Sequence, residues 1–497
     1  METNCINDIQ PNTSQSLSEI SLASLRQLKS PLGAFFQVSL PESREPLFCQ
    51  NVVRILPGKR LVAFGTWGDK TVVIKLFYAR GKSAQHAERD YEGIKILTDG
   101  AVLAPAVYYH GPALNKRIRV IVFEKIAGLN LDDIWQGKQN IKSLHRLLKA
   151  MTIELATQHV LGILQHDLHF KNFIIQKNRI YTIDGGAVEV FDKPLSKIIS
   201  IDNLALFFAQ LGVGKIALKQ SLFQLYAQSR GWQRKEKDLK RLELSEKNWQ
   251  KSRWENYSEK IMRTCTAFMR LSSSRSAIMY DRSYETSELL SCLKNPDAKM
   301  TTAQILKNGR SATVAKIKID QHEMVLKRYN IKGIFHWLRR CLRPTRAACG
   351  WKLGQLLRIS DIPTAKPIAY IEKTFLGLRN KSYFLMEYVE GVTAGEFFET
   401  ISVSDPVAID VAQQIVEIFF DLALLKITHG DLKKTNILIR DNNPVLIDLD
   451  GMTLHKSNYA FKLAFKAEIK RFMENWHSFP SVYKLFDGLI KQKILNE

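Results

Sequence analysis

Two kinds of apolar pattern alternate along the first half of the chain: short strand-like runs and longer stretches with helical spacing. Residues 61–67 alternate between apolar and polar positions, and Trp67-Gly68-Asp69-Lys70 has the composition of a hairpin turn. Thr71 to Phe77 then reads as a buried strand that carries one lysine, Lys75. A lysine in such a strand is costly unless it meets an anion. The pattern therefore predicts a hairpin whose second strand presents a cation to an anionic ligand.

Helical spacing follows at residues 85–97 and again at 144–155, with a central strand expected at 120–124 between them. The first of these helices offers Asp90 as an acidic partner for Lys75, with Glu88 as the other candidate. The first half thus contains, in order, a strand with Lys75, a helix, a central strand and a long helix.

The same series recurs in the second half of the chain. Residues 306–314 have the form of a strand, a glycine turn at Gly309 and a second strand, and the turn's N–H groups are candidates to cover phosphates. Lys327 then repeats Lys75. Tyr383 to Gly391 reads as a strand and hinge where adenine would bind, with Glu387 in it, and residues 409–425 have the spacing of a long helix.

The second long helix leads into His429-Gly430-Asp431, with an asparagine five positions after the aspartate and a second aspartate twelve further on: Asp431, Asn436 and Asp448. Phosphoryl transfer needs such groups. One carboxylate takes the proton of the acceptor hydroxyl, and an amide with a second carboxylate holds magnesium against the nucleotide phosphates. The string predicts a catalytic Asp431 with Asn436 and Asp448 as metal ligands.

The first half contains the same spacing in Asp167, Asn172 and Asp184. Two copies with identical internal spacing indicate an internal duplication. We therefore expect an α+β fold of two tandem protein-kinase-like bilobal domains, each with an antiparallel-sheet N-lobe and a mainly helical C-lobe. The expected divisions are a partly disordered N-terminal arm at 1–44, a first domain at 45–296 and a second at 297–497.

Composition and net charge indicate which partners and which cellular compartment suit the chain. The 497 residues carry a formal net charge of +23, which favours an anionic partner. The six cysteines form no Cys-x-x-Cys pair, which fits free thiols in a reducing cytosol. We expect no secretory signal and no membrane-spanning stretch, so membrane association would be peripheral. Residues 328–346 interleave aromatic and cationic side chains, a composition suited to an acidic lipid surface or a phosphosugar, and equally to a basic surface helix.

Together these residues resemble the protein-kinase-like superfamily, and within it the bacterial lipopolysaccharide core kinases, the Kdo and heptose kinase family. The passages that carry the resemblance are Val325 to Lys332 with Trp337 to Arg340, Ile447 to Asp450, and Lys470 to Phe472 with Asn475-Trp476. The resemblance covers most of residues 300–480 and is looser over 50–295.

The resemblance implies ATP with Mg²⁺ and, as acceptor, a heptose or Kdo hydroxyl of the lipopolysaccharide core or a lipid A–core precursor. It implies a cytoplasmic protein at the inner face of the inner membrane, in contact with that anionic surface, and no nucleic-acid partner. Lys75 and Lys327 would hold the α- and β-phosphates. Asp167 and Asp431 would be catalytic, and Asn172, Asp184, Asn436 and Asp448 would bind metal.

Each copy departs from the family pattern in a different place. In the first, Gln165 replaces the usual loop histidine; in the second, no acid lies between Arg346 and Ser360 to pair with Lys327, and Gln355 is the only amide there. Alternatives therefore remain: a protein kinase, an aminoglycoside-type phosphotransferase, or a pseudokinase scaffold with one inactive domain. The absence of an arginine before either loop aspartate argues against a protein kinase regulated through its activation loop.

Overall fold

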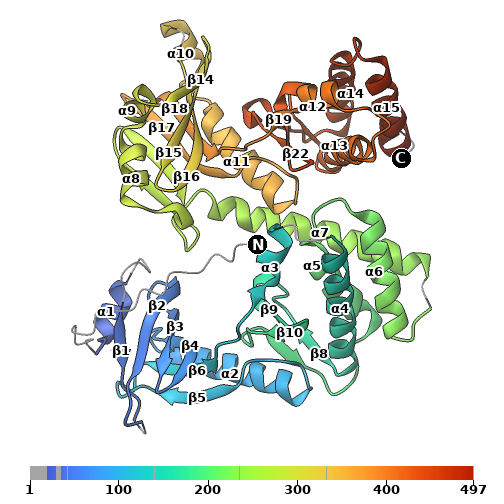
Figure 1. Cartoon of the computed structure of the whole chain (residues 1–497). Coiled ribbons are helices and arrows are strands. Elements are labelled where there is room, and N and C mark those ends of the chain that lie inside the picture. The colour runs from blue at the N-terminus through green and yellow to red at the C-terminus, as the bar shows by residue number, and fades with distance from the viewer. Residues whose placement is uncertain are drawn as a thin grey trace. The chain divides into compact units, whose positions relative to one another are not determined.

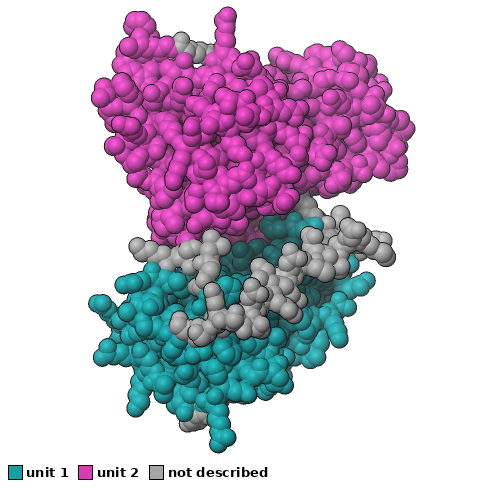
Figure 2. All heavy atoms as spheres, turned by 60° about the vertical axis from the view of Figure 1, so that its left-hand side comes forward, with its two compact units in different colours: residues 1–203, 222–235 teal, residues 204–221, 236–497 magenta. Residues whose placement is uncertain are grey.

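The computed structural model describes residues 19–28, 35–41, 43–137, 141–233, 235–331 and 333–495. The chain forms two compact units, coloured separately in Figure 2: unit 1 comprises residues 1–203 and 222–235, and unit 2 comprises 204–221 and 236–497. Each strand ladder in the described ranges is antiparallel, and helices follow each main sheet in the chain (Figure 1), so the predicted α+β class with antiparallel sheets is confirmed.

Unit 1 begins with a six-stranded sheet in the order β1-β2-β3-β4-β6-β5. The strands are β1 (Phe36–Val38), β2 (Leu47–Leu56), β3 (Arg60–Trp67), β4 (Lys70–Phe77), β5 (Val107–Pro112) and β6 (Arg119–Glu124). The predicted hairpin is confirmed, since Trp67 pairs with Lys70 and Gly68 takes a φ of 58° in the turn. Helix α2 (Ser83–Asp99) packs against this sheet and buries Ile94 and Leu97.

The expected arm over residues 1–44 is wrong in its second part. Strand β1 is the edge strand of the first sheet and helix α1 (Leu22–Gln27) packs on it, because Leu25 and Phe36 are buried in the same core as β2 and β3. Their apolar side chains remove enough surface from water to hold these short elements in place. Residues 1–18 lie outside the described ranges.

The rest of unit 1 is the helical part that follows β6. Its elements are β7 (Leu129–Asn130), α3 (Leu131–Gln136), α4 (Ile141–Val160), β8 (Ile163–Gln165), η1 (Phe170–Asn172), β9 (Phe173–Gln176), β10 (Arg179–Thr182), β11 (Val188–Val190), α5 (Lys197–Phe208) and α6 (Ile216–Ser229). The division between the units falls within α5 and α6. The β9–β10 hairpin separates the candidate ligands Asn172 and Asp184, so a rigid two-stranded frame fixes both.

Unit 2 contains a seven-stranded sheet in the order β12-β13-β17-β18-β16-β15-β14. The strands are β12 (Phe268–Ser272), β13 (Ser276–Asp281), β14 (Gln304–Asn308), β15 (Ala312–Ile319), β16 (His322–Tyr329), β17 (Pro367–Phe375) and β18 (Leu378–Glu387). Helices α7 (Glu236–Lys260), α8 (Ser287–Lys294) and α9 (Pro296–Thr301) precede or interrupt the strands, and α10 (Ile334–Arg340) and α11 (Arg346–Ile359) lie between β16 and β17 in the chain.

The structure does not divide at the expected boundary of residue 296. Strand β13 pairs with β17 from Ser276–Lys373 to Tyr280–Ala369, and its Ile278 is buried in the core of the second sheet. The Asn295-Pro296 step instead starts α9, where proline's fixed φ suits the first helical turn. Residues 236–296 therefore belong to unit 2, because the backbone pairing of β13 with residues 89 to 97 positions later outweighs the local effect of the Asn-Pro step.

The helical part of unit 2 supports the second candidate loop. Its elements are β19 (Val392–Thr393), α12 (Ala394–Thr400), α13 (Pro406–Leu424), β20 (Ile427–Thr428), η3 (Lys434–Asn436), β21 (Ile437–Arg440), β22 (Asn443–Leu446), η4 (Leu449–Gly451), β23 (Thr453–Leu454), α14 (Asn458–Glu474), α15 (Pro480–Ile490) and η5 (Lys491–Leu495). The apolar face of α13 packs with α14 and α15 around Phe472, Trp476 and Phe486, which are fully buried. Within the described ranges, no helix is long and apolar enough to span a bilayer.

Candidate active site

The loop after β20 in unit 2 is tied to the strand that carries its second aspartate. The Asn436 side-chain amide donates to the Asp431 carbonyl at 2.7 Å, and the Ile447 N–H donates to the Asn436 carbonyl at 3.0 Å. These two bonds link Asp431, Asn436 and the residue before Asp448 into one unit. The structure therefore brings the three predicted groups of the second copy together.

A buried glutamate, Glu468 of α14, holds the start of this loop. Its carboxylate accepts the N–H of His429 at 2.8 Å and the N–H of Gly430 at 2.5 Å. The ring of His429 is fully buried and its Nε2 lies 2.9 Å from the Ile447 carbonyl, so Nε2 carries the proton and donates it. Burial lowers the pKa of His429, which keeps the ring neutral. We did not predict Glu468, because its neighbours in the chain give no sign of its distant partners.

Lys327 finds its acids in the segment after β22, not on α11. Its Nζ lies 2.5 Å from Asp448 and 2.7 Å from Asp450. Gln355, the only amide on α11, is buried elsewhere and accepts a hydrogen bond from Tyr257. The missing helix acid is therefore replaced by Asp450, two residues after the predicted metal ligand.

The two carboxyl groups beside Lys327 differ in acidity. Burial, followed by the hydrogen bond between the two carboxyl groups, raises the pKa of Asp450. Burial opposes ionisation of Asp448 as well, but the hydrogen bond with Asp450 and the Lys327 ammonium lower the pKa of Asp448 below its ordinary value. Asp448 is therefore the more acidic carboxyl of the pair, and its ionised form is the one that binds a cation.

Three other candidate site residues of the second copy, Asp431, Gly309 and Glu387, already have partners within unit 2. Asp431 is partly exposed, and its carboxylate lies 2.8 Å from the Lys433 ammonium. The Gly309 N–H donates to the Ala312 carbonyl within the β14–β15 turn, so this amide is already used. Glu387, at the end of β18, pairs with Arg440 at 3.2 Å. The roles of Gly309 and Glu387 in nucleotide binding stay predictions.

Unit 1 repeats the geometry of the loop. The Asn172 side-chain amide donates to the Asp167 carbonyl at 3.0 Å, and the Ile183 N–H donates to the Asn172 carbonyl at 2.9 Å. These bonds match, atom for atom, the two that tie Asp431, Asn436 and Ile447. The duplication visible in the spacing is thus a duplication of local structure.

The lysine of the first copy has the helix acid that the second copy lacks. Nζ of Lys75 lies 2.8 Å from Asp90 and 3.7 Å from Asp184, so the predicted contact with α2 is confirmed. Glu88, the other candidate, lies beside His110 instead, at 3.6 Å. Burial raises the pKa of the Asp90 carboxyl, although Lys75 opposes this.

Asp184 is the strongly acidic member of the first site. Burial opposes its ionisation, but the Lys75 ammonium and the Gly186 N–H lower the pKa of Asp184 to about 2. Two arginines that we did not predict also belong here. Burial and then Arg60 lower the pKa of Arg54, while the nearby carboxylates of Asp184 and Asp167 act in the opposite direction. Asp167 and Asp184 therefore both interact electrostatically with Arg54 of β2.

Gln165 replaces the loop histidine of the first copy, and a different network supports that loop. The Gln165 side chain donates to Gln158 at 2.6 Å, and Asn203 donates to the Gln165 carbonyl at 2.8 Å. The ring of His159 is buried between Asn203 and Tyr226, and burial lowers the pKa of His159 to about 4. In unit 1, neutral side chains therefore hold the residue before the loop through its carbonyl, whereas in unit 2 the Glu468 carboxylate holds the N–H groups of the loop.

The donor chemistry at both sites fits magnesium. Mg²⁺ prefers carboxylate and carbonyl oxygens, and it is usually held by one or two protein carboxylates together with substrate phosphates. In unit 2, Nδ2 of Asn436 donates to the loop, which leaves its amide oxygen as a potential ligand beside anionic Asp448. Asn172 and Asp184 offer the same pair in unit 1.

Comparison with known proteins supports the kinase-like assignment of the second half. The sequence profile of the RIO domain matches residues 377–475, which include the second candidate loop and Glu468. A search among curated proteins found no relative. The fold assignment rests on the RIO domain match and on the geometry of the loops.

Several solved structures are similar over part of the chain. A co-crystal structure of WbdD with the kinase inhibitor LY294002 is 20% identical over 38% of this chain and 47% of that one, with a TM-score of 0.28. A structure of the bifunctional kinase-methyltransferase WbdD is 18% identical over 42% of this chain and 53% of that one, with a TM-score of 0.31. A mutant PknI kinase domain of Mycobacterium tuberculosis is 12% identical over 37% of this chain and 76% of that one, with a TM-score of 0.26. The chain spans about half the length of the WbdD structures. It has a protein-kinase-like α+β fold, and such a fold uses ATP and Mg²⁺.

Proposed function

We propose that this protein is an ATP-dependent kinase of two tandem kinase-like domains that phosphorylates a heptose or Kdo hydroxyl of the lipopolysaccharide core. The observation that carries the phosphotransfer is the linked group of Lys327, Asp431, Asn436 and Asp448. The acceptor class is supported by the family resemblance, by the +23 net charge and by a surface of unit 2 described below.

The residues of unit 2 divide the work of phosphoryl transfer. The Asp431 carboxylate is partly exposed and orients the acceptor hydroxyl, from which it takes the proton. Lys327 exchanges its carboxylate partners for nucleotide phosphates. Asn436 and Asp448 would hold Mg²⁺, which neutralises the charge of the phosphates when bound. Glu468 fixes the loop, so Asp431 needs little reorganisation during the reaction.

An exposed apolar surface of unit 2, the α10 surface, supports an acceptor held in a membrane. Trp337 contacts Phe375 with ring centroids 6.4 Å apart, which joins α10 to the β17–β18 turn. The α10 surface consists of Ile334, Phe335, Leu338, Leu342, Phe375 and Leu376, each at least 55% exposed. The chain has no acidic residue between Glu323 and Asp361. Apolar side chains within a basic segment are suited to an anionic bilayer, so we propose peripheral contact at the inner face of the inner membrane.

Vesicle binding tests this surface. Phe335→Ser combined with Leu376→Ser should weaken co-sedimentation with phosphatidylglycerol vesicles about tenfold, because two exposed apolar anchors are lost. Leu463→Ser, which removes an exposed leucine of α14, is the matched control and should bind as wild type does. Equal binding of all three proteins would exclude the α10 surface as the anchor.

The function itself is tested by the phosphate content of the core oligosaccharide, measured by mass spectrometry in cells that express wild-type or variant protein. We expect Asp431→Ala to lose the phosphate, and Asp410→Ala, an exposed aspartate on α13, to retain it. Asp167→Ala should lose less than Asp431→Ala, because the second copy matches the kinase pattern more fully. Core phosphorylation that is unchanged in Asp431→Ala would reject the proposal.

A protein kinase is the second candidate, because the RIO domain profile matches residues 377–475. Incubation of the purified protein with labelled ATP and both kinds of acceptor separates the two. Label in protein but none in lipid A–core would favour the second candidate.

A further inference from the structure

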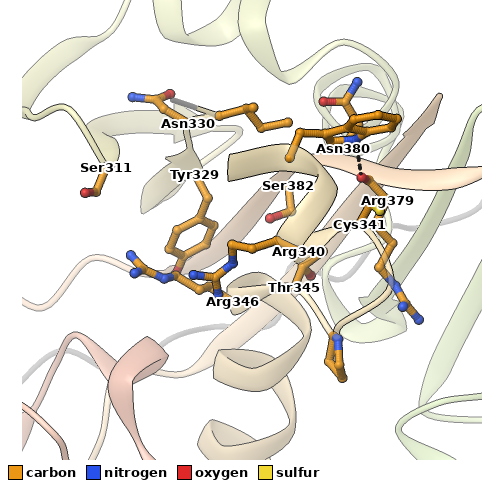
Figure 3. Close-up of a pocket in the computed structure, with 13 residues that line it drawn as sticks. Ser311, Tyr329, Asn330, Arg340, Cys341, Thr345, Arg346, Arg379, Asn380 and Ser382 are labelled. Carbon is orange, nitrogen blue, oxygen red and sulfur yellow. Dashed lines mark hydrogen bonds between the residues drawn. The ribbon is translucent and has the colours of Figure 1, made fainter. Parts of the chain in front are cut away.

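A small cavity in unit 2 lies at the start of α11, at the edge of the sheet where β16 ends and β18 begins. Its volume is about 80 Å³, several times the roughly 10–15 Å³ that one water molecule requires. It is formed by the end of β16, by α10, by the first residues of α11 and by β18 (Figure 3). None of its thirteen lining residues is acidic.

Two arginines provide positive charge in this cavity. Arg340 of α10 has no carboxylate partner among the described residues, and Arg346 makes only a distant contact of 3.8 Å with Asp450. Burial lowers the pKa of Arg340, and the neighbouring guanidinium of Arg346 lowers it further. Figure 3 shows both side chains reaching toward the ring of Tyr329, whereas Arg379 points away and donates to the Leu342 carbonyl. Two like charges that share only one distant carboxylate, Asp450, among the described residues are suited to binding an anion.

The start of α11 adds to this field. The helix runs for 14 residues from Arg346, has no acidic residue in its first turn and is capped by Thr345. The positive end of its helix dipole favours an anion at the cavity.

A buried hydroxyl points independently to a ligand. Tyr329 is only 7% exposed, and its hydroxyl has no hydrogen-bond partner among the described residues. Leaving such a group unpaired costs about 1–3 kcal/mol. The tyrosine lines the cavity beside Arg346, so an anion bound there would accept a hydrogen bond from the Tyr329 hydroxyl.

We infer that this cavity binds a phosphate group already present on the acceptor, through Arg340, Arg346 and the Tyr329 hydroxyl. The assignment of the phosphate to the acceptor rests on the proposed function. In the proposed function the nucleotide would bind at Lys327 and Asp448, which form an ion pair outside the cavity lining. Arg346 connects the cavity to the catalytic group through Asp450, so an acceptor phosphate bound here lies beside the transfer centre.

Equilibrium dialysis of radiolabelled inorganic phosphate against the full chain, at constant ionic strength, tests the cavity without any enzymatic assay. Wild type should bind phosphate saturably. Arg340→Gln should weaken binding about tenfold or more, and Tyr329→Phe by a smaller factor, since each removes one donor to a charged ligand. Arg339→Gln removes the same charge from the preceding residue of α10, which does not line the cavity, and should bind as wild type does. Equal affinity of all four proteins, or no saturable binding by wild type, would overturn the inference.

Steady-state kinetics then tests what carries the phosphate. Arg340→Gln should raise the KM for the phosphorylated acceptor at least several-fold and leave the KM for ATP unchanged. A raised KM for ATP would assign the cavity to the nucleotide and overturn the acceptor assignment. If dialysis succeeds but no core sugar is ever phosphorylated, the phosphate site stands, while the proposed function and the acceptor assignment both fail.

Discussion

The most specific expectation concerns Glu468, which joins α14 to the candidate catalytic loop. Its carboxylate accepts two backbone N–H groups, those of His429 and Gly430, and is only 4% exposed. A hydrogen bond to a charged group contributes about 1.5–3 kcal/mol, so the two bonds are worth roughly 3–6 kcal/mol. Burial of the carboxylate raises the pKa of Glu468 and offsets part of this. We therefore expect Glu468→Ala to destabilise unit 2 by about 2–4 kcal/mol.

Glu468→Gln should lie between wild type and Glu468→Ala. The amide keeps one oxygen that can accept an N–H, but its NH₂ group faces the other N–H and cannot accept it. Calorimetry of the full chain measures the effect. Because a chain with two units need not unfold in one step, each transition must be followed separately. For a unit of this size, the loss in Glu468→Ala corresponds to a fall in Tm of roughly 5–10 °C.

Catalysis provides the second readout. A displacement of about 1 Å at Asp431 costs on the order of 100-fold in rate, so kcat of Glu468→Ala should fall by about that factor. The affinity for ATP should stay near that of wild type, because Lys327 and Asp448 are untouched. Glu474→Gln, an exposed position on the same helix, is the control and should change neither quantity. A Glu468→Ala protein with wild-type Tm and kcat would refute this account of the loop.

Three further expectations follow from individual residues. Burial raises the pKa of Asp421 to about 7 from an ordinary 3.8, so the folded state keeps a proton that the unfolded chain releases. Stability should fall by on the order of 4 kcal/mol as pH rises from about 4 to 7 and then level off, and Asp421→Asn should flatten the plot of Tm against pH. Gly430 has a φ of 83° and would place a Cβ 2.4 Å from a backbone oxygen, so Gly430→Ala should lower Tm, whereas Gly488→Ala, with open space around it, should not. Asp90→Asn should weaken ATP binding to unit 1, measured with a fluorescent nucleotide, and Glu88→Gln should not; equal affinities would contradict the pairing with the strand lysine.

Local patterns predicted the parts of the molecule whose signal lies within a few residues. The hairpin at Gly68, the strand lysines and the two loops are such parts, because turn chemistry and fixed spacing specify them directly. The pairing of Lys75 with Asp90 was also within reach, since helical spacing places only two acids near the lysine.

Long-range contacts decided what the patterns missed. The division of the chain differs from the expected one because β13 pairs with β17, whose residues lie about 90 positions later. Glu468 lies 38 residues after Gly430, and no local feature marks it as the acceptor of the loop's N–H groups. The arginines Arg54 and Arg60 reached their site through the register of the first sheet.

By itself, the sequence determined that two copies of one loop exist and which side chains each copy presents, because spacing along a covalent chain needs no folding to be seen. Only the tertiary structure decided which acid holds Lys327. The lysine requires a nearby anion once it is buried, and any carboxylate that the fold brings within about 3 Å satisfies it. Asp450 meets that need from a distant segment, where the expected helix offers only Gln355.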